Sequence, residues 1–287
     1  MHLLFRFLAL FPLRALHALG DGIGRLLWLI PNNRRRTALR NIAACFPEMT
    51  PAEQAALCRE SLRHEMKSVA ETPFFWLGPK DKLLASIHQS TGEELLERAL
   101  ARGKGVILLT MHLGGWEAAG HAYATRHPIT GLYKPQGGAL EALGLQGRSR
   151  TGAKLIATQG GSVRQQAIPL LANNEALYFM PDQDPPEGRG IFAPFFGVMA
   201  HSPVLVAKLV QETGAAVIFM YSERLPKGRG FVAHYHAAPE GIDSPDLLTA
   251  VTAMNQGVER CVRECPQQYW WAYRRFRRRP PGEPAFY

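Results

Sequence analysis

Residues 105–117 read GVILLTMHLGGWE, and this stretch decides the fold. Its first part, from Gly105 to Met111, is a continuous apolar run, which is typical of a strand buried on both faces of a sheet. The glycine pair Gly114-Gly115 then permits a tight turn, and a helix is expected to begin near Trp116. A buried strand that leads through a turn into a helix predicts an α/β fold.

Segments of the same two kinds alternate along the rest of the chain. Further strands are expected at 129–133, 154–157, 176–180, 215–221 and 231–236. Further helices are expected at 50–70, 92–101, 138–150, 162–173, 203–213 and 246–264. We therefore expect one α/β domain with a mostly buried central sheet flanked by helices.

The first 30 residues are rich in Leu and Phe but carry charges. Four charged residues between Arg6 and Arg25 leave no uncharged run of the ~20 residues that a simple bilayer span requires. On a helical wheel the charges gather on one side, the pattern of an amphipathic helix. Pro12 and the glycines at 20, 22 and 24 predict a bend or break, and the basic residues 34–36 follow, as they often do beside a membrane segment.

Membrane attachment by residues 1–32 is therefore expected, with the helix lying in the interface or tilted through the bilayer. An apolar helix packed on the domain and a cleaved signal peptide are the alternatives.

The composition narrows the choice of partners. The formal net charge is +9, so anionic partners are expected: nucleic acid, phospholipid headgroups or acidic carrier proteins. The four cysteines include no C-x-x-C pair, which argues against a disulfide framework and against a zinc ribbon.

A histidine followed five positions later by an acid occurs twice in the chain. His88 and Glu93 form the first pair, which we assign to chance because Glu93 resembles a first-turn acid at a helix start. His112 and Glu117 form the second, and His112 follows the carboxyl end of the buried strand, where α/β sheets place ligand and catalytic sites. Position, more than spacing, makes His112 the candidate.

The chemistry of this second pair suits general base catalysis. His112 can take a proton from an attacking hydroxyl near neutral pH, and Glu117 is expected to hold the imidazole in the required tautomer. The N–H groups of Gly114 and Gly115 are expected to be free and to face an oxyanion. A histidine with a purely structural role is the alternative.

Motifs along nearly the whole chain carry a family resemblance. They are Arg34 to Ile42 with Phe46-Pro47-Glu48, His112 to Glu117, Tyr133-Lys134-Pro135, Arg148-Ser149-Arg150, Pro181 to Asp184, Pro194 to Gly197, and Gln268 to Trp271 with Arg274-Arg275-Phe276. In this order they resemble the late lipid A biosynthesis acyltransferases of the lauroyl/myristoyl type, relatives of the glycerol-phosphate acyltransferases that share a His-x4-acid motif.

The resemblance implies a reaction and a place for it. A fatty acyl group would pass from an acyl carrier protein thioester to a hydroxyl of a Kdo-bearing lipid A precursor, at the cytoplasmic face of the bacterial inner membrane. Residues 33–287 would form the catalytic domain, with a glycerol-phosphate acyltransferase-like fold and a basic, aromatic C-terminal segment. A lysophospholipid or ornithine-lipid acyltransferase is the alternative within enzymes.

The resemblance also implies roles for individual residues of this chain. His112 would be the base and Glu117 its partner, while Arg150 stands where the wider superfamily places an arginine that contacts acceptor phosphate. Arg148 and Lys134 are nearby cations that can do the same work, and each is otherwise a solvated surface charge.

The family needs no metal and no cofactor, and none is expected here. Asp182 is expected at a substrate-binding site, with turn capping as its alternative and a metal pair with Asp184 disfavoured.

The roles of two further segments remain open at this point. Pro194 to Met199 is expected either to line an acyl-chain tunnel or to belong to the core. The aromatic and basic run Tyr269 to Arg279 is typical of a membrane interface, although nucleic-acid binding would use the same residue types. We expect the phospholipid surface as partner and no nucleic acid; a structural or transport role at the membrane is a further alternative.

Overall fold

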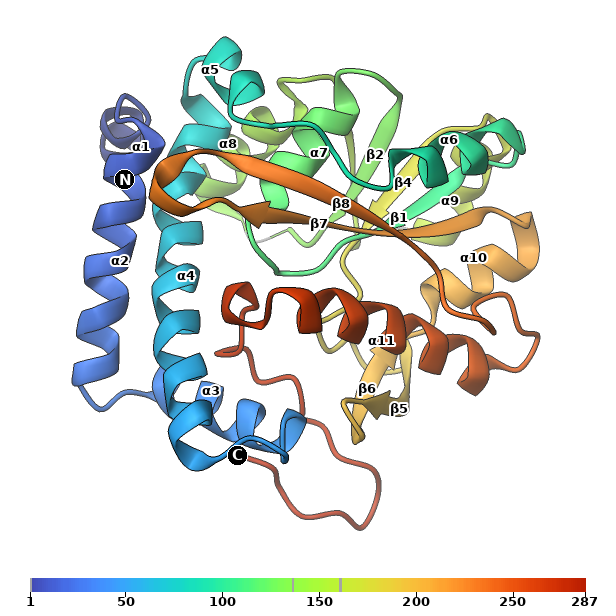
Figure 1. The fold of residues 1–287 in the computed structure, drawn as a ribbon. Helices are drawn as coiled ribbons and strands as arrows, with labels where there is room; N and C mark the ends of the chain where they lie inside the picture. The colour runs from blue at the N-terminus through green and yellow to red at the C-terminus, as the bar shows by residue number, and fades with distance from the viewer. Residues whose placement is uncertain (1, 136, 160–161) are drawn as a thin grey trace.

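The computed structural model describes residues 2–135, 137–159 and 162–287 (Figure 1). Its α-helices are α1 (His2–Leu8), α2 (Leu13–Leu29), α3 (Asn33–Cys45), α4 (Pro51–Leu77), α5 (Lys80–Ala85), α6 (Glu93–Ala101), α7 (Trp116–Ala124), α8 (Gly138–Ser149), α9 (Val163–Ala172), α10 (Leu205–Thr213) and α11 (Leu247–Glu264). Its strands are β1 (Val106–Leu109), β2 (Ile129–Tyr133), β3 (Lys154–Ala157), β4 (Ala176–Phe179), β5 (Gly190–Phe195), β6 (Val198–Pro203), β7 (Ala216–Arg224) and β8 (Phe231–Ala237). Two short 3-10 helices are η1 (Pro226–Gly228) and η2 (Pro266–Gln268).

Six of these strands form the central sheet, in the order β3-β2-β4-β1-β7-β8. Neighbouring strands are parallel except for β7 and β8, which pair antiparallel. Each of the six corresponds to a stretch that the sequence predicts as a strand. The expected α/β architecture, a central sheet flanked by helices, is confirmed, and the structure shows that this sheet is mostly parallel.

Strand β1 lies at the centre of the core, and its side chains alternate between two hydrophobic layers. Val106 and Leu108 pack with α6 and α7, whereas Ile107 and Leu109 pack with α9, α10 and α11. All four residues are fully buried. Helices thus cover both faces of the sheet, with α7 and α11 on opposite sides in Figure 1, which explains the uninterrupted apolar run.

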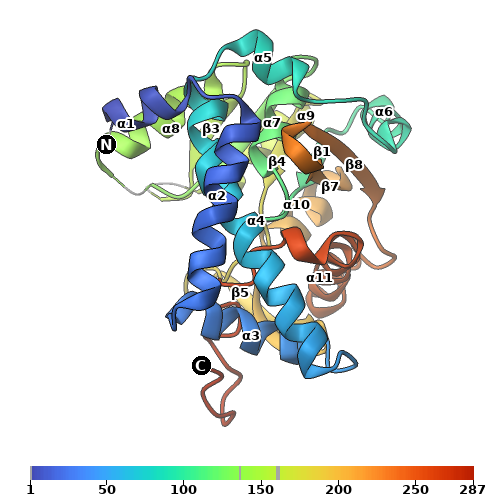
Figure 2. The same cartoon turned by 60° about the vertical axis from the view of Figure 1, so that its left-hand side comes forward.

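Helices α2 and α4 lie side by side along one edge of the molecule (Figures 1 and 2). Gly20 and Gly24 permit this contact, because a Cβ at either position would lie 2.4–2.7 Å from backbone atoms of α4. The predicted break at Pro12 is confirmed, since α1 ends at Leu8 and α2 begins at Leu13. A break at the glycines was wrong: α2 runs through them, and they serve close helix packing instead.

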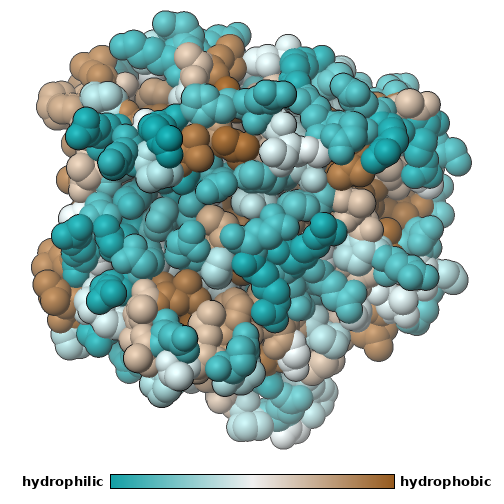
Figure 3. Space-filling model, in the orientation of Figure 1, coloured by the Kyte–Doolittle hydropathy of each residue, from teal (hydrophilic) through white to brown (hydrophobic). Residues whose placement is uncertain are grey.

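The polar side of α2 faces α4 and its apolar side faces outward. Asp21 accepts from Arg63 and Lys67 of α4 at 2.7 and 3.1 Å, and His17 contacts Glu71 at 2.8 Å. The exposed apolar residues of the N-terminal segment include Leu3, Leu4, Phe7, Leu10, Leu19, Ile23, Leu26, Leu29 and Ile30. Brown patches in Figure 3 lie along the left-hand edge, where Figure 1 places α1 and α2. None of the helices in the described part of the chain combines the length and hydropathy that a bilayer crossing requires.

Strands β5 and β6 form a separate hairpin that the sequence did not predict. Phe196 and Gly197 connect them with φ values of 50° and 74°, as two-residue hairpin turns require. The N–H of Phe196 donates to Glu259 at 2.8 Å, which helps to hold a bulky residue in this unfavourable conformation. Phe195 and Phe196 are buried in the main core, which favours core packing over a tunnel lining for this segment.

The contact between α3 and α4 buries a carboxylate. Glu65 of α4 forms an ion pair with Arg34 of α3, and only 2% of the Glu65 side chain is exposed. Burial raises the pKa of Glu65 to about 7, and the charge of Arg34 opposes this rise only in part.

The glycine contact between α2 and α4 predicts opposite effects for neighbouring substitutions. Gly20→Ala should lower the free energy of unfolding by roughly 1–3 kcal/mol, because its new methyl group meets α4 backbone. Gly22→Ala has open space around its Cβ and should raise the free energy of unfolding by up to ~1 kcal/mol through helix propensity. Thermal unfolding of both variants in one detergent tests this, and equal melting temperatures would contradict it.

The buried Glu65 predicts a pH dependence of stability. Between about 4.5 and about 7 the folded protein retains a proton on Glu65 that the unfolded chain releases, so stability should fall as pH rises through this window. Glu65→Gln should flatten the fall, by roughly 3 kcal/mol. Urea unfolding at both ends of the window measures it, with Glu60→Gln, on the same helix but 37% exposed, as the control that should retain the wild-type slope.

Candidate active site

Two parallel strands bring His112 and Asp182 together. Leu109 at the end of β1 stands opposite Phe179 at the end of β4. His112 and Asp182 each follow their strand end by the same three positions, so both lie at the carboxyl edge of the sheet. This is the edge at which α/β proteins place ligand and catalytic groups.

Asp182 contacts both the imidazole and the backbone of His112. The Asp182 carboxylate lies 3.0 Å from His112 Nδ1 through Oδ1, and its Oδ2 accepts the backbone N–H of His112 at 2.9 Å. Burial acts to raise the pKa of Asp182, but the charge and hydrogen bonds of His112 outweigh it and hold the pKa below its usual value. Asp182 is therefore an ionised, buried partner.

The contact with Asp182 sets the tautomer of His112. With Nδ1–H donated to the carboxylate, Nε2 carries the lone pair. The side-chain amide nitrogen of Gln183 lies 3.2 Å from Nε2 and is placed to donate to it. The His112 side chain is 17% exposed, so the imidazole is partly accessible, and Gln183 occupies the position beside Nε2 that a substrate hydroxyl would take.

Two tryptophans flank the imidazole. Trp116 at the start of α7 and Trp270 after η2 stack on each other with ring centres 5.6 Å apart. The ring of His112 lies against the edges of this pair, at 5.3 Å from Trp116 and 5.5 Å from Trp270. The backbone N–H of Trp270 also donates to the His112 carbonyl at 3.0 Å. The aromatic pair restricts the imidazole to one orientation.

Glu117 has a different partner from the one expected. The described residues show no hydrogen bond between Glu117 and His112; the Glu117 carboxylate instead binds Arg148, with Oε1 2.6 Å from Nη2 and 3.0 Å from Nε. Burial acts to raise the pKa of Glu117, but Arg148 outweighs it and lowers the pKa. Asp182, expected at a substrate-binding site or a turn cap, occupies the place beside His112 that Glu117 was expected to fill.

The glycine turn does not leave its N–H groups free, so that expectation was wrong. Gly114 donates to the Gln268 carbonyl at 3.1 Å and Gly115 to the Ser222 carbonyl at 2.8 Å. Gly114 has φ +63°, and a Cβ there would lie 1.9 Å from the Ser222 oxygen, so glycine is required. The turn is tied to β7 and to the C-terminal segment because its backbone groups are buried and must be paired.

A buried arginine, Arg224, also fixes this turn. The sequence did not predict it. Arg224, at the end of β7, donates through Nη2 to the Gly114 carbonyl at 2.8 Å and to Ser68 at 2.7 Å. The same guanidinium forms a bidentate pair with Glu71 at 2.6 and 2.8 Å. Burial acts to raise the pKa of Glu71, but Arg224 and His17 outweigh it and lower the pKa. No local motif marks this pair, whose members lie 153 positions apart.

The other predicted cations lie in different surroundings. Arg148 remains 38% exposed beside Glu117 and packs 5.2 Å from the Trp76 ring. Arg150 donates to the carbonyls of Phe75, at 3.3 Å, and Gly78 at the C-terminal end of α4, an interaction that caps this helix. Lys134 is exposed just after β2. Of the three, only Arg148 binds a residue of the His112 to Glu117 segment.

The aromatic and basic C-terminal run is partly buried in the core, although Arg274 and Arg277 are exposed, and its place at a membrane interface stays a prediction. Trp271, Arg275 and Phe276 are at most 3% exposed. Asp184 helps to anchor the run, since it binds Arg277 and lies 3.3 Å from Arg278. Across residues 2–135, 137–159 and 162–287, no three His, Cys, Asp or Glu side chains are grouped as a metal ion would need.

Comparison with known proteins gives this site its context. The bacterial lipid A biosynthesis acyltransferase family matches residues 2–278 of the chain. The lipid A biosynthesis lauroyltransferase of Escherichia coli K12 is 27% identical over 280 residues, which cover 96% of this chain and 90% of that protein. The palmitoleoyltransferase of the same organism is 28% identical, with 96% and 89% covered, and its myristoyltransferase 24% identical, with 91% and 80% covered.

The family match therefore spans nearly the whole chain, including both strand ends that carry His112 and Asp182, and these relatives are aligned over most of their own length. The protein belongs to the bacterial lipid A biosynthesis acyltransferases.

Proposed function

We propose that this acyltransferase moves a fatty acyl group from an acyl carrier protein thioester to a hydroxyl of a Kdo-bearing lipid A precursor. The observation that carries the proposal is the His112 imidazole, whose Nδ1 lies 3.0 Å from the buried Asp182 carboxylate and whose side chain remains 17% exposed. The names of the relatives support acyl transfer in lipid A biosynthesis, but they differ in the acyl chain and leave its length open.

In the proposed reaction His112 acts as a general base. Its Nε2 removes the proton of the acceptor hydroxyl as the oxygen attacks the thioester carbonyl carbon. The carbon–sulfur bond then breaks, and the leaving thiolate takes the proton from His112. Asp182 stabilises the imidazolium between these two transfers without itself accepting the proton.

Direct transfer, without an acyl-enzyme, agrees with the state of the cysteines. All four are free and buried. Burial raises the pKa of the Cys58 and Cys265 thiols to about 12, and a thiol must ionise to act as a nucleophile. The sequence also contains no Gly-x-Ser-x-Gly elbow that would supply a nucleophilic serine.

Glu117 takes a supporting role in this proposal. Its carboxylate fixes the guanidinium of Arg148, which stays partly exposed on the Glu117 side of the site. A planar guanidinium suits a phosphate or a polar sugar group of the acceptor. We propose that Arg148 meets the acceptor and that Glu117 positions Arg148.

We also propose that residues 1–32 attach the enzyme to the cytoplasmic face of the bacterial inner membrane. The support is the outward apolar side of α1 and α2, on which Leu26 and Leu29 are 54% and 73% exposed. An exposed apolar surface of this kind is expected to dock on a partner or a membrane rather than to face water.

Transfer assays with purified protein test the substrate assignment. Acyl carrier protein thioester is supplied with a Kdo-bearing lipid A precursor, a lysophospholipid or an ornithine lipid in parallel, and products are identified by mass spectrometry. We expect acylation of the lipid A precursor. Transfer restricted to one of the other two acceptors would overturn the assignment and favour that acceptor's class.

The two carboxylates near His112 predict different kinetic losses. His112→Ala should remove nearly all transfer, and Asp182→Asn should lower kcat by roughly 10²–10⁴ because the imidazole loses its ionised partner. Glu117→Gln should mainly raise KM for the acceptor, because Arg148 loses its anchor. Steady-state kinetics separate these effects; if Glu117→Gln lowered kcat as much as Asp182→Asn, Glu117 would be the working partner of His112 instead.

A double-mutant cycle isolates the role of Glu117. When Glu117 acts through Arg148, the losses of Glu117→Gln and Arg148→Gln should not add in the double variant. Fully additive losses would show that the two residues act separately.

The exposed leucines of α2 predict a change in membrane partition. Leu26→Gln with Leu29→Gln should lower binding to lipid vesicles by roughly 10²-fold, because each leucine contributes about 1.5–3 kcal/mol on burial. Leu140→Gln with Leu248→Gln is a matched control, since these leucines are 40% and 48% exposed on other helices. Vesicle flotation measures the bound fraction, and equal losses in the two pairs would contradict attachment through α2.

A further inference from the structure

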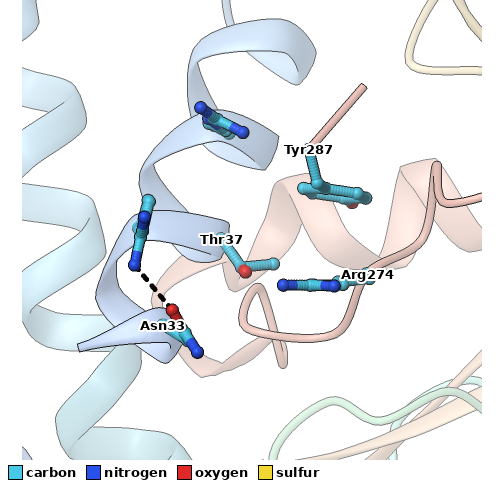
Figure 4. A pocket seen from close by; sticks show the side chains of 6 residues that line it. Asn33, Thr37, Arg274 and Tyr287 are labelled. Carbon is cyan, nitrogen blue, oxygen red and sulfur yellow. Dashed lines mark hydrogen bonds between the residues drawn. The ribbon is translucent and has the colours of Figure 1, made fainter. Parts of the chain in front are cut away.

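A pocket of about 240 Å³ opens between α3 and the C-terminal segment (Figure 4). Its lining residues are Asn33, Arg36, Thr37, Arg40, Arg274 and Tyr287. In Figure 4, Arg274 and Thr37 point toward one another across the pocket, with Tyr287 on the C-terminal side. Its size suits a small headgroup rather than an acyl chain.

One face of α3 supplies four of the six residues. Asn33, Arg36, Thr37 and Arg40 follow the spacing i, i+3, i+4, i+7, which places them in a row on one side of a helix. Arg36 is held by Asn33, whose Oδ1 accepts from Nη2 at 2.6 Å. The row presents two guanidinium groups and one hydroxyl to the same hollow.

The C-terminal segment closes the pocket and is itself anchored. The amide of Asn41, the residue after Arg40, donates to the carbonyls of Trp271 and Tyr273, both at 2.7 Å. The hydroxyl of Tyr287 donates to Asn41 Oδ1 at 2.6 Å, and the Arg274 guanidinium lies 5.6 Å from the Tyr287 ring. The third arginine is therefore built into the pocket and not simply a loose surface charge.

The arginines of the pocket are not paired with carboxylate side chains in the described part of the chain. Across the described residues, Arg36, Arg40 and Arg274 form no ion pair with a carboxylate, whereas Arg34 beside them binds Glu65. Three guanidinium groups around one hollow attract a multiply charged oxyanion, and the planar fork of arginine matches phosphate.

The position of the pocket indicates where that phosphate comes from. Ile30, 51% exposed, ends the outward apolar side of α2, and the pocket begins three residues later at Asn33. The ring of Trp270 lies against His112. Arg274 is four positions after Trp270, so the Cα atoms of Trp270 and Arg274 lie within ~14 Å of each other. A lipid with its chains along α2 would carry its headgroup to this pocket.

We infer that the Asn33, Arg36, Thr37, Arg40, Arg274 and Tyr287 pocket binds the phosphate group of a lipid headgroup. The lipid is either the acceptor, in which case the inference rests on the proposed function, or a phospholipid of the surrounding bilayer. Both present the same phosphate chemistry to the three arginines.

A pair of charge-matched double variants tests the inference in two arms. Arg36→Gln with Arg40→Gln removes the α3 arginines of the pocket. Arg164→Gln with Arg260→Gln removes two arginines of α9 and α11 that are 52% and 60% exposed and lie outside it. One arm measures the Kd of the detergent-solubilised full chain for a phosphorylated lipid A precursor and for the same lipid after phosphatase treatment. The other measures binding to phosphatidylcholine vesicles with and without phosphatidic acid.

The pocket variant is expected to lose roughly tenfold in affinity for the phosphorylated ligand of at least one arm, with the control variant near wild type. A loss with the precursor alone identifies the acceptor, a loss with phosphatidic acid alone identifies the bilayer lipid, and a loss in both identifies a site for either. Arg274→Lys, which keeps the charge but not the fork, should fall between wild type and the double variant.

Equal behaviour of the pocket and control variants in both arms would overturn the inference, and so would affinity that does not depend on the phosphate. Melting temperatures verify folding, which these exposed side chains should not alter. Failure of the proposed function would appear separately, as absent acyl transfer by the wild-type enzyme.

Discussion

The guanidinium of Arg224 joins parts of the chain that are far apart in sequence, and the site depends on it. It links Glu71 and Ser68 of α4 to the end of β7 and to the carbonyl of Gly114. Removing one partner of such a buried pair typically costs about 3–5 kcal/mol, because a charge is then left in the core without compensation. The turn that follows His112 is consequently fixed by the same contact that fastens the helical edge of the molecule to the sheet.

The sheet could be predicted from sequence because its strands obey a local rule. A strand buried on both faces, such as β1, appears as a short apolar run, and all six strands of the sheet fall in stretches that the sequence predicts as strands. The β5–β6 hairpin was not, because its turn residue Phe196 belongs to no usual turn signature and depends on Glu259, 63 positions away. The contacts of Arg224 were not predicted either, because its partners are distant in sequence and no local motif around Arg224 indicates them.

The sequence predicts the position of the candidate active site, but not the residue that pairs with His112. His112 was predicted from its place after a buried strand, whereas Glu117 was predicted as its partner from the His-x4-acid spacing, the family resemblance and its place in the first turn of the following helix. The parallel pairing of β1 with β4 brings Asp182 closer in space. Aligning the two strand ends, rather than reading along one segment, would have pointed to Asp182, since both residues follow their strands by equal distances.

The glycine contact between α2 and α4 has a geometric consequence for the proposed membrane enzyme. With two backbones this close, α2 has no room to slide or tilt on α4, and α4 is in turn bound to the site through Arg224. The distance between the outward apolar side of α2 and the basic nitrogen of His112 is therefore fixed. If the apolar side of α2 docks on a bilayer, the His112 nitrogen lies at a fixed height above the lipid headgroups. Whether a hydroxyl of the acceptor is acylated would then depend in part on how deep that hydroxyl lies in the bilayer.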